Sequence, residues 1–366
     1  MIRQNFNADW TVEKGDGNSR MNSFLGNTQT KTVHLPYDAM IHEARTPDTK
    51  NGAQTGFYPG GEYIFQKHFT APQAWQGKPV SLVFEGVYQT ALVYLNGWLL
   101  TRNVNGYAEF TVEAGPYLKY GADNLLKVIA DNSLEPNSRW YTGSGIYRPV
   151  RLLVGNKVYL PQDTVRITTR EADEGFALLD VTAQVQSAST VTERVTLQQT
   201  ICREGTAVLT DRQNLLLQPG ESRTVSFRYC VDSPALWSPE NPNLYTSTMQ
   251  VLEGEEELDR EETGFGIRTL SIDAAHGVRI NGQTVKLRGA CIHHDNGILG
   301  AATLPDAEER RIRQLKEAGF NAIRSSHHPA GRALLDACDR YGVLVMDELS
   351  DVWNVRKNPY DYALYF

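Results

Sequence analysis

The stretch from residue 289 to residue 346 constrains the fold most strongly, because strand patterns and amphipathic helix patterns alternate along it. "GACIH", "NAIRSSHH" and "VLVMDEL" are predicted strands, and "AEERRIRQLKEA" and "GRALLDACDRYG" are the predicted helices between them. Strands joined through a helix lie parallel in one sheet. The pattern therefore predicts a parallel α/β sheet or the first three βα units of a (β/α)8 barrel.

The first of these helices carries its own boundary signals. Asp306 is expected to cap it, with Glu309 three residues later completing a capping box, and Gly319 is placed to end it. Ile312 and Leu315 belong to its buried stripe.

The chain before this region reads as all-β. From Tyr63 to about Leu153, short apolar–polar alternations are separated by turn residues, and Asn96-Gly97 predicts a type I′ hairpin turn. A second all-β block runs from Val158 to Leu270. We therefore expect a jelly-roll-like β-sandwich in residues 1–157, an immunoglobulin-like β-sandwich in 158–270 and an incomplete barrel in 271–366.

Charge and hydropathy exclude several classes of partner. The net charge is −7 without a block of Lys and Arg, which argues against nucleic acid and anionic membranes and favours a neutral substrate. No stretch approaches the ~20 apolar residues of a membrane span, and the start lacks a signal-peptide pattern. We expect a cytoplasmic protein whose four cysteines are reduced.

Two histidine pairs are the clearest candidates for chemistry. His293-His294 and His327-His328 each follow a predicted parallel strand, where barrels and α/β sheets gather functional groups. Arg324 precedes the second pair, and Asp347 with Glu348 ends the third strand. These residues predict a polar mouth of imidazole, guanidinium and carboxylate.

Structural roles compete with this interpretation. Loop histidines are often merely hydrogen-bonded, Arg324 suits a buried ion pair, and Asp347 suits a strand-end cap. Metal binding is a further alternative, but adjacent histidines on a regular strand point to opposite faces and cannot chelate one ion. We predict no metal and no cofactor.

An aromatic segment, "SRWYTGSGIYRPV", ends the first sandwich. Trp140 and Tyr141 offer faces on which sugar rings stack, and Arg139 can donate to hydroxyls. Packing at a domain interface is an equal alternative.

Six segments in this order and spacing resemble glycoside hydrolase family 2. They are "FEGVYQTALVYLNG", "SRWYTGSGIYRPV", "ETGFGIRTL", "LRGACIHHDNG", "NAIRSSHHP" and "CDRYGVLVMDE". The resemblance implies hydrolysis with retention by two glutamates ~5 Å apart. In the family these glutamates lie at the ends of the fourth and seventh barrel strands, so we expect no catalytic residue in this chain and place both beyond Phe366. The chain then resembles the N-terminal part of a longer enzyme.

The resemblance also assigns supporting residues. His293 and His327 match positions that line the sugar subsite, and Arg324 matches the arginine that orients the nucleophilic glutamate. Asp347 matches an acid near the subsite floor. Arg139 stands where better-known members have a sugar-binding aspartate, which puts that contact in doubt; Arg139 and Trp140 remain substrate-binding candidates.

Substrate choice rests on the same resemblance. The segments Leu35 to Lys67 and "RWYTGSGIYR" are most similar to bacterial β-galactosidases, with β-glucuronidase as the alternative and a non-catalytic carbohydrate-binding or assembly fragment as a further one. Some members bind magnesium just after the third strand, where Val352 and Asn354 stand here, so that ion is not predicted. The resemblance implies a homo-oligomeric full-length enzyme.

Overall fold

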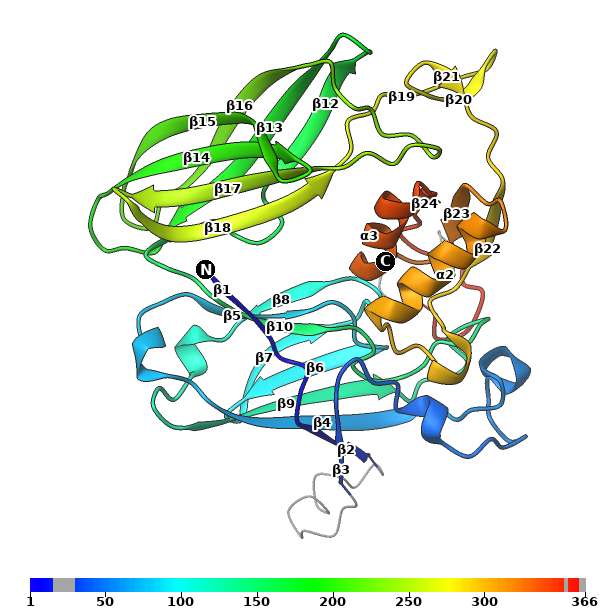
Figure 1. The fold of residues 1–366 in the computed structure, drawn as a ribbon. Helices are drawn as coiled ribbons and strands as arrows, with labels where there is room; N and C mark the ends of the chain where they lie inside the picture. The colour runs from blue at the N-terminus through cyan, green and yellow to red at the C-terminus, as the bar shows by residue number, and fades with distance from the viewer. Residues whose placement is uncertain (16–29, 352–354, 362–366) are drawn as a thin grey trace.

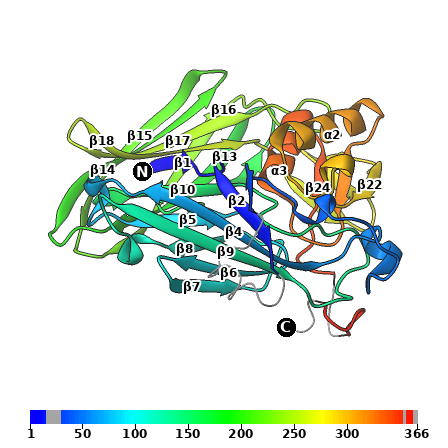
Figure 2. The ribbon, with the colours of Figure 1, turned by 90° about the horizontal axis from the view of Figure 1, so that it is seen from below.

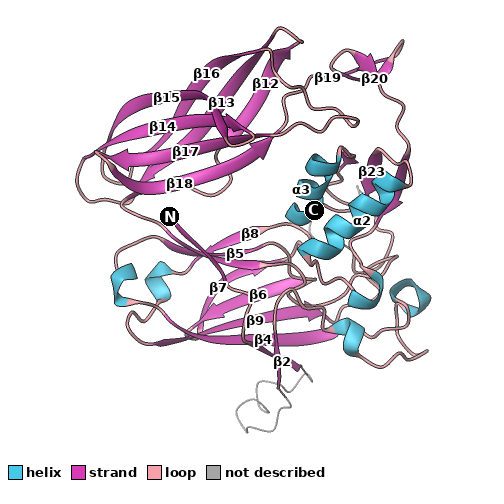
Figure 3. Ribbon diagram, in the orientation of Figure 1, coloured by secondary structure: helices cyan, strands magenta, loops and turns pink. Residues whose placement is uncertain are grey.

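The computed structural model describes residues 1–15, 30–351 and 355–361, and within these ranges the chain forms three bodies in sequence order (Figure 1). The first two are built from antiparallel strands, and the last combines helices with parallel strands (Figure 3). Two views show the β-sandwiches side by side, with the helices α2 and α3 at one end of them (Figures 1 and 2). The predicted succession of jelly-roll-like sandwich, immunoglobulin-like sandwich and barrel start is confirmed.

The first body is a sandwich of two antiparallel sheets, ordered β3-β2-β4-β9-β6-β7 and β1-β10-β5-β8. The strands are β1 Ile2–Asn5, β2 Trp10–Lys14, β3 Lys31–Val33, β4 Gly61–Thr70, β5 Val80–Phe84, β6 Thr90–Leu95, β7 Trp98–Asn103, β8 Phe110–Glu113, β9 Asp123–Asn132 and β10 Val150–Val154. Inward side chains such as Trp10, Phe65 and Leu82 are buried between the sheets. Asn96 and Gly97 both have positive φ in the β6–β7 turn, as a type I′ hairpin requires.

The second body is also a sandwich, with one sheet ordered β15-β14-β17-β18 and β13 pairing with β11, β12 and β16 in the other. The strands are β11 Val158–Tyr159, β12 Arg166–Ala172, β13 Phe176–Ser187, β14 Glu193–Arg203, β15 Thr206–Leu217, β16 Ser222–Asp232, β17 Tyr245–Glu253 and β18 Glu256–Phe265. Strict alternation along β13 places Leu179 and Val181 in the core between the sheets. Within the described residues all four cysteines are free thiols, Cys202 and Cys230 included.

The third body begins with the hairpin β19–β20–β21 and continues as alternating strands and helices. Its elements are β19 Leu270–Asp273, β20 Gly277–Ile280, β21 Gln283–Thr284, β22 Gly289–Ile292, α2 Pro305–Glu317, β23 Ala322–Ser325, α3 Arg332–Tyr341 and β24 Leu344–Met346. Short 3-10 turns occupy Met40–His42, Gly52–Thr55, Gln73–Trp75, Gly115–Tyr117 and Gly297–Leu299. The strands β22, β23 and β24 pair in parallel, as the alternating pattern predicts.

The predicted cap of α2 is wrong in one respect. The helix begins at Pro305, and the N-cap residue is Leu304, which makes no side-chain capping bond. Proline fits the first helical position because it lacks the N–H that would be unpaired there. Asp306 lies inside the first turn, where its charge favours the helix dipole, and Glu309 instead accepts hydrogen bonds from Tyr341 and Arg340.

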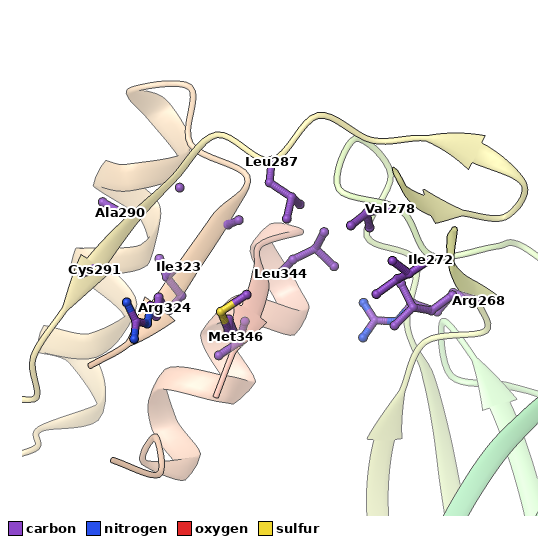
Figure 4. A pocket seen from close by; sticks show the side chains of 14 residues that line it. Arg268, Ile272, Val278, Leu287, Ala290, Cys291, Ile323, Arg324, Leu344 and Met346 are labelled. Atoms are coloured by element: carbon purple, nitrogen blue, oxygen red, sulfur yellow. The ribbon is translucent and has the colours of Figure 1, made fainter. Parts of the chain in front are cut away.

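One face of the β22–β24 sheet is apolar and borders a cavity of about 500 Å³ (Figure 4). Across the cavity lies the β19–β20 hairpin, whose Ile272 and Val278 face Leu344 and Met346. A (β/α)8 barrel packs such branched and apolar side chains in its interior. The lining therefore fits an inward barrel face better than a binding site for polar sugars.

Contacts made by α2 and α3 join the barrel start to both sandwiches. At the start of α3, Arg332 forms ion pairs with Glu109 of the first sandwich and with Asp163, which precedes β12 of the second. Gly342, directly after α3, packs against the backbone of Pro239, and Lys316 in the last turn of α2 donates to the Pro239 carbonyl at 2.5 Å. The barrel start thus has fixed contacts with both sandwiches.

Candidate active site

The two predicted histidine pairs come together at the C-terminal ends of β22 and β23. The strands run parallel with Ile292 opposite Ser325, so the residues that follow emerge at the same edge. His293 and His327 approach each other with ring centroids 6.1 Å apart, and His294 and His328 with centroids 4.8 Å apart. We call the first two the outer pair and the last two the inner pair.

Trp140 of the first sandwich packs on the outer pair. Its indole stacks on His293, with ring centroids 5.0 Å apart and planes at 18°, and meets His327 edge-on at 5.6 Å. Its Nε1 donates to the hydroxyl of Tyr107 at 3.1 Å. The half-buried indole and the two imidazoles form an amphipathic surface of the kind on which a sugar ring can stack while its hydroxyls find hydrogen-bond partners.

Arg324 and His327 share a carboxylate that follows β24. Arg324 Nε donates to Glu348 Oε1, and His327 Nδ1 lies 2.6 Å from Oε2 of the same group. Burial would raise the pKa of Glu348, but the hydrogen bonds from Arg324 and His327 outweigh it and hold the pKa below its ordinary value. Glu348 is therefore an ionised anchor that fixes both predicted site residues.

Asp347 and Arg139 occupy less central positions. Asp347 is exposed, and its Oδ1 accepts a hydrogen bond from the backbone N of Ala330 at 2.9 Å, which ties down the loop before α3. Arg139 pairs with Asp351, which also binds Lys357 at 2.9 Å, while its guanidinium carbon lies 5.9 Å from the centre of the Trp140 ring. The sugar contacts predicted for these two residues stay predictions.

The inner pair was not singled out from the sequence as a unit with its own role. His294 is buried, and its Nε2 donates to the Thr142 carbonyl at 2.9 Å, while His328 stacks on Tyr107 with centroids 4.4 Å apart. Burial lowers the pKa of His294 well below its ordinary value and that of His328 to about 3. Both rings are therefore neutral at physiological pH. The only sign of the inner pair in the sequence was that each His-His dipeptide supplies a second histidine beside the outer one.

Asp38 is a buried residue that sequence reasoning missed. Its buried carboxylate accepts hydrogen bonds from the Tyr141 hydroxyl at 2.6 Å, from the backbone N of Ala301 at 2.8 Å, and from the backbone N of both Met40 and Ser144 at 3.0 Å. Burial raises the pKa of Asp38, although each of these bonds opposes that rise. The residue joins the aromatic segment to the loop that follows the first histidine pair.

Across residues 1–15, 30–351 and 355–361, no three His, Cys, Asp or Glu side chains are grouped to hold an ion. Val352 and Asn354, considered for magnesium, lie outside these ranges. Nowhere in the same ranges is a helix both long and apolar enough to cross a membrane.

The order of domains and the histidine-rich strand ends define a class of protein, and comparison with sequence models of known families agrees. Residues 10–176 match the galactose-binding domain-like model of glycosyl hydrolase 2, residues 158–268 match glycosyl hydrolases family 2, and residues 274–359 match the TIM barrel domain of that family. The chain belongs to glycosyl hydrolase family 2.

Three individual members of the family are similar to this chain over nearly its whole length. The β-galactosidase BoGH2A of Bacteroides ovatus is 38% identical over 365 residues, covering 100% of this chain and 43% of the relative. A family 2 member from Bacteroides cellulosilyticus has a structure with TM-score 0.95 and 36% identity, covering all of this chain and 48% of that one. The structure of a β-glucuronidase of Bacteroides uniformis has a TM-score of 0.85 and 28% identity. The match covers 98% of this chain and 43% of that one. The chain thus spans about half or less of the length of these proteins.

Proposed function

We propose that the protein to which this chain belongs hydrolyses terminal β-D-galactosides with retention of anomeric configuration. The observation that supports this most directly is the continuous similarity to a β-galactosidase over the entire chain. The outer histidine pair and Trp140 supply the kind of surface that a galactose ring requires, with an aromatic face and hydrogen-bonding groups together.

In this proposal the described residues bind and position the sugar, and do not cleave it. Retaining hydrolysis uses a nucleophilic carboxylate and an acid/base carboxylate ~5 Å apart. The carboxylates near the outer pair are engaged otherwise: Glu348 holds Arg324 and His327, and Asp351 holds Arg139 and Lys357. We place both catalytic glutamates in the part of the relatives that this chain does not span.

A β-glucuronidase is the second candidate, because relatives with that name also align along nearly the whole chain. Hydrolysis of nitrophenyl β-galactoside and nitrophenyl β-glucuronide, measured for the 366-residue chain and for the product of the complete gene, separates the possibilities. We expect only the longer protein to turn over, and the galactoside to be preferred. Preferential cleavage of the glucuronide would replace the first candidate with the second.

Retention is tested separately by NMR of the first-formed product. The proposal requires β-galactose to appear before mutarotation, and initial α-galactose would overturn it. Galactose binding to the short chain, measured by calorimetry, together with no turnover by the product of the complete gene, would instead support a carbohydrate-binding fragment.

We further propose a cytoplasmic homo-oligomer. The free thiols among the described residues suit a reducing compartment, and the oligomer follows from the family resemblance alone. Cell fractionation tests the first point, and light scattering of the full-length protein tests the second.

A further inference from the structure

A small cavity lies behind the inner histidine pair, where the first sandwich meets the barrel start. Its volume is about 10 Å³, and its lining includes Arg148 from the sandwich, His294 and His328 from the strand ends, and Glu308 from α2. The four side chains are between 2% and 6% exposed. His293 of the outer pair also borders this space.

Each of these side chains has one buried polar atom without a hydrogen-bond partner in the protein. The atoms are Arg148 Nε, His294 Nδ1, His328 Nε2 and Glu308 Oε2. A buried polar atom left unsatisfied costs about 1–3 kcal/mol, and native proteins contain few of them. His293 Nδ1 is a fifth such atom, and five in the lining of one cavity point to a shared partner.

In each imidazole, the hydrogen bond made by the other ring nitrogen determines whether the unpartnered nitrogen is a donor or an acceptor. His294 Nε2 donates to the Thr142 carbonyl, and His328 Nδ1 donates to the Pro329 carbonyl at 3.1 Å. Because both rings are neutral, the remaining nitrogens are lone-pair acceptors. Arg148 Nε is a donor, while its other guanidinium nitrogens already donate to the carbonyls of Tyr107 and Pro329.

A partner must therefore donate to the imidazoles and accept from the guanidinium. A metal cation cannot accept a hydrogen bond and would be repelled by Arg148. An anion would face the lone pairs of both histidines and the carboxylate of Glu308. Glu308 is the least dependent on the partner, because its Oε1 already accepts from Asn296 and its Oε2 lies 3.8 Å from Arg311.

We propose that the cavity is a binding site for one ordered water molecule, which accepts from Arg148 Nε and donates to His294 Nδ1 and His328 Nε2. A cavity of about 10–15 Å³ is the size that holds a single water, and buried waters make about three hydrogen bonds. The water links the first sandwich to the ends of β22 and β23. It thereby fixes the loops that carry the outer pair.

A crystal structure of the 366-residue chain at a resolution that defines water tests the proposal. We expect one density peak ~2.7–3.2 Å from all three nitrogens. The proposal fails if the cavity is empty or if Arg148 Nε bonds directly to a protein atom. A crystal soaked in zinc serves as a control, and anomalous density in the cavity would overturn the assignment to water.

Two conservative variants test the energetic link in solution. His294→Gln keeps a donor for the Thr142 carbonyl, and His328→Asn keeps a donor for the Pro329 carbonyl. Each loses the second ring nitrogen, which accepts from the water at a position that the shorter amide group does not occupy. Each should lower Tm, and the double variant should lower it by less than the sum, because one water serves both rings. The exposed His276→Gln is the matched control, expected to leave Tm unchanged. Fully additive losses would contradict a shared water.

Discussion

Trp140 and His293 stack across the boundary between the first sandwich and the barrel start, with ring centroids 5.0 Å apart. One residue lies in a loop of the sandwich, and the other directly follows β22. The candidate sugar surface is therefore made jointly by two bodies. Its geometry depends on how the barrel start is seated against the sandwiches.

Trp140→Ala should lower kcat/KM of the full-length enzyme for nitrophenyl β-galactoside by at least about tenfold, which corresponds to ~1.4 kcal/mol of transition-state stabilisation. The reason is loss of the aromatic face beside His293 and His327. Trp140→Phe should retain most of the activity. Steady-state kinetics provide the measurement, with Trp98→Ala as the control because Trp98 is 66% exposed on β7. Equal kcat/KM for Trp140→Ala and wild type would remove Trp140 from the site.

Glu348→Gln should change the pH dependence of stability. Because Arg324 and His327 lower the pKa of Glu348 in the folded state, the carboxylate stabilises the fold above its unfolded pKa of about 4.3. That contribution is lost as the pH falls through the lower folded pKa. Urea unfolding should show the wild type more stable than the variant at pH 7, and this difference should shrink as the pH falls to 2.

The exposed Glu255→Gln, in the turn between β17 and β18, is the control and should behave as wild type at both pH values. A stability difference between wild type and Glu348→Gln that is as large at pH 2 as at pH 7 would show that the charge of Glu348 is not what holds Arg324 and His327.

Asp38→Asn should lower the free energy of unfolding by about 3 kcal/mol, because hydrogen bonds to a buried charged group are worth more than neutral ones. Every group that contacts this carboxylate is a donor, so the amide NH2 of asparagine would face another donor. Urea denaturation measures the change. Asp123→Asn, at a side chain 62% exposed, should change stability by less than ~0.5 kcal/mol. Similar values for the two variants would contradict the anchoring role of Asp38.

Gly342→Ala should destabilise the protein by clearly more than Gly319→Ala. Both glycines have positive φ, which costs an alanine roughly 1 kcal/mol. Only at Gly342 would the added Cβ also collide, 2.3 Å from the carbonyl oxygen of Pro239, whereas nothing lies within 4 Å at Gly319. Thermal unfolding of the pair isolates the contact between α3 and the second sandwich. Equal losses would indicate that this contact yields without cost.

Local patterns predicted much of the fold. The period of the apolar residues indicated the antiparallel sandwiches and the parallel β22–β24 sheet, and the Asn-Gly turn falls where positive φ was expected, at Asn96. The predicted N-cap of α2 was wrong because two sequence signals for a helix start compete at this point. The sequence alone could not decide between Pro305 as the first helical residue and Asp306 as the cap.

The candidate site was only partly predictable, because some of its contacts join residues that are far apart in the sequence. Strand-end position is a local property, so His293, His327 and Arg324 could be singled out as candidates. Asp38 could not, because its partner Ala301 is 263 residues away and no local pattern marks a carboxylate that receives distant backbone donors. Glu348 was visible as a strand-end acid, but its pairing with Arg324 depends on the parallel register.

The ion pairs of Arg332 have a consequence for the order in which the nascent chain folds. Glu109 and Asp163 are synthesised well before Arg332, and domains generally fold as units from the N-terminus while the ribosome is still adding residues. Two folded sandwiches then present a pair of carboxylates as α3 emerges. On that order of folding, both carboxylates are in place before Arg332 is synthesised, and α3 can pair with them as soon as it forms.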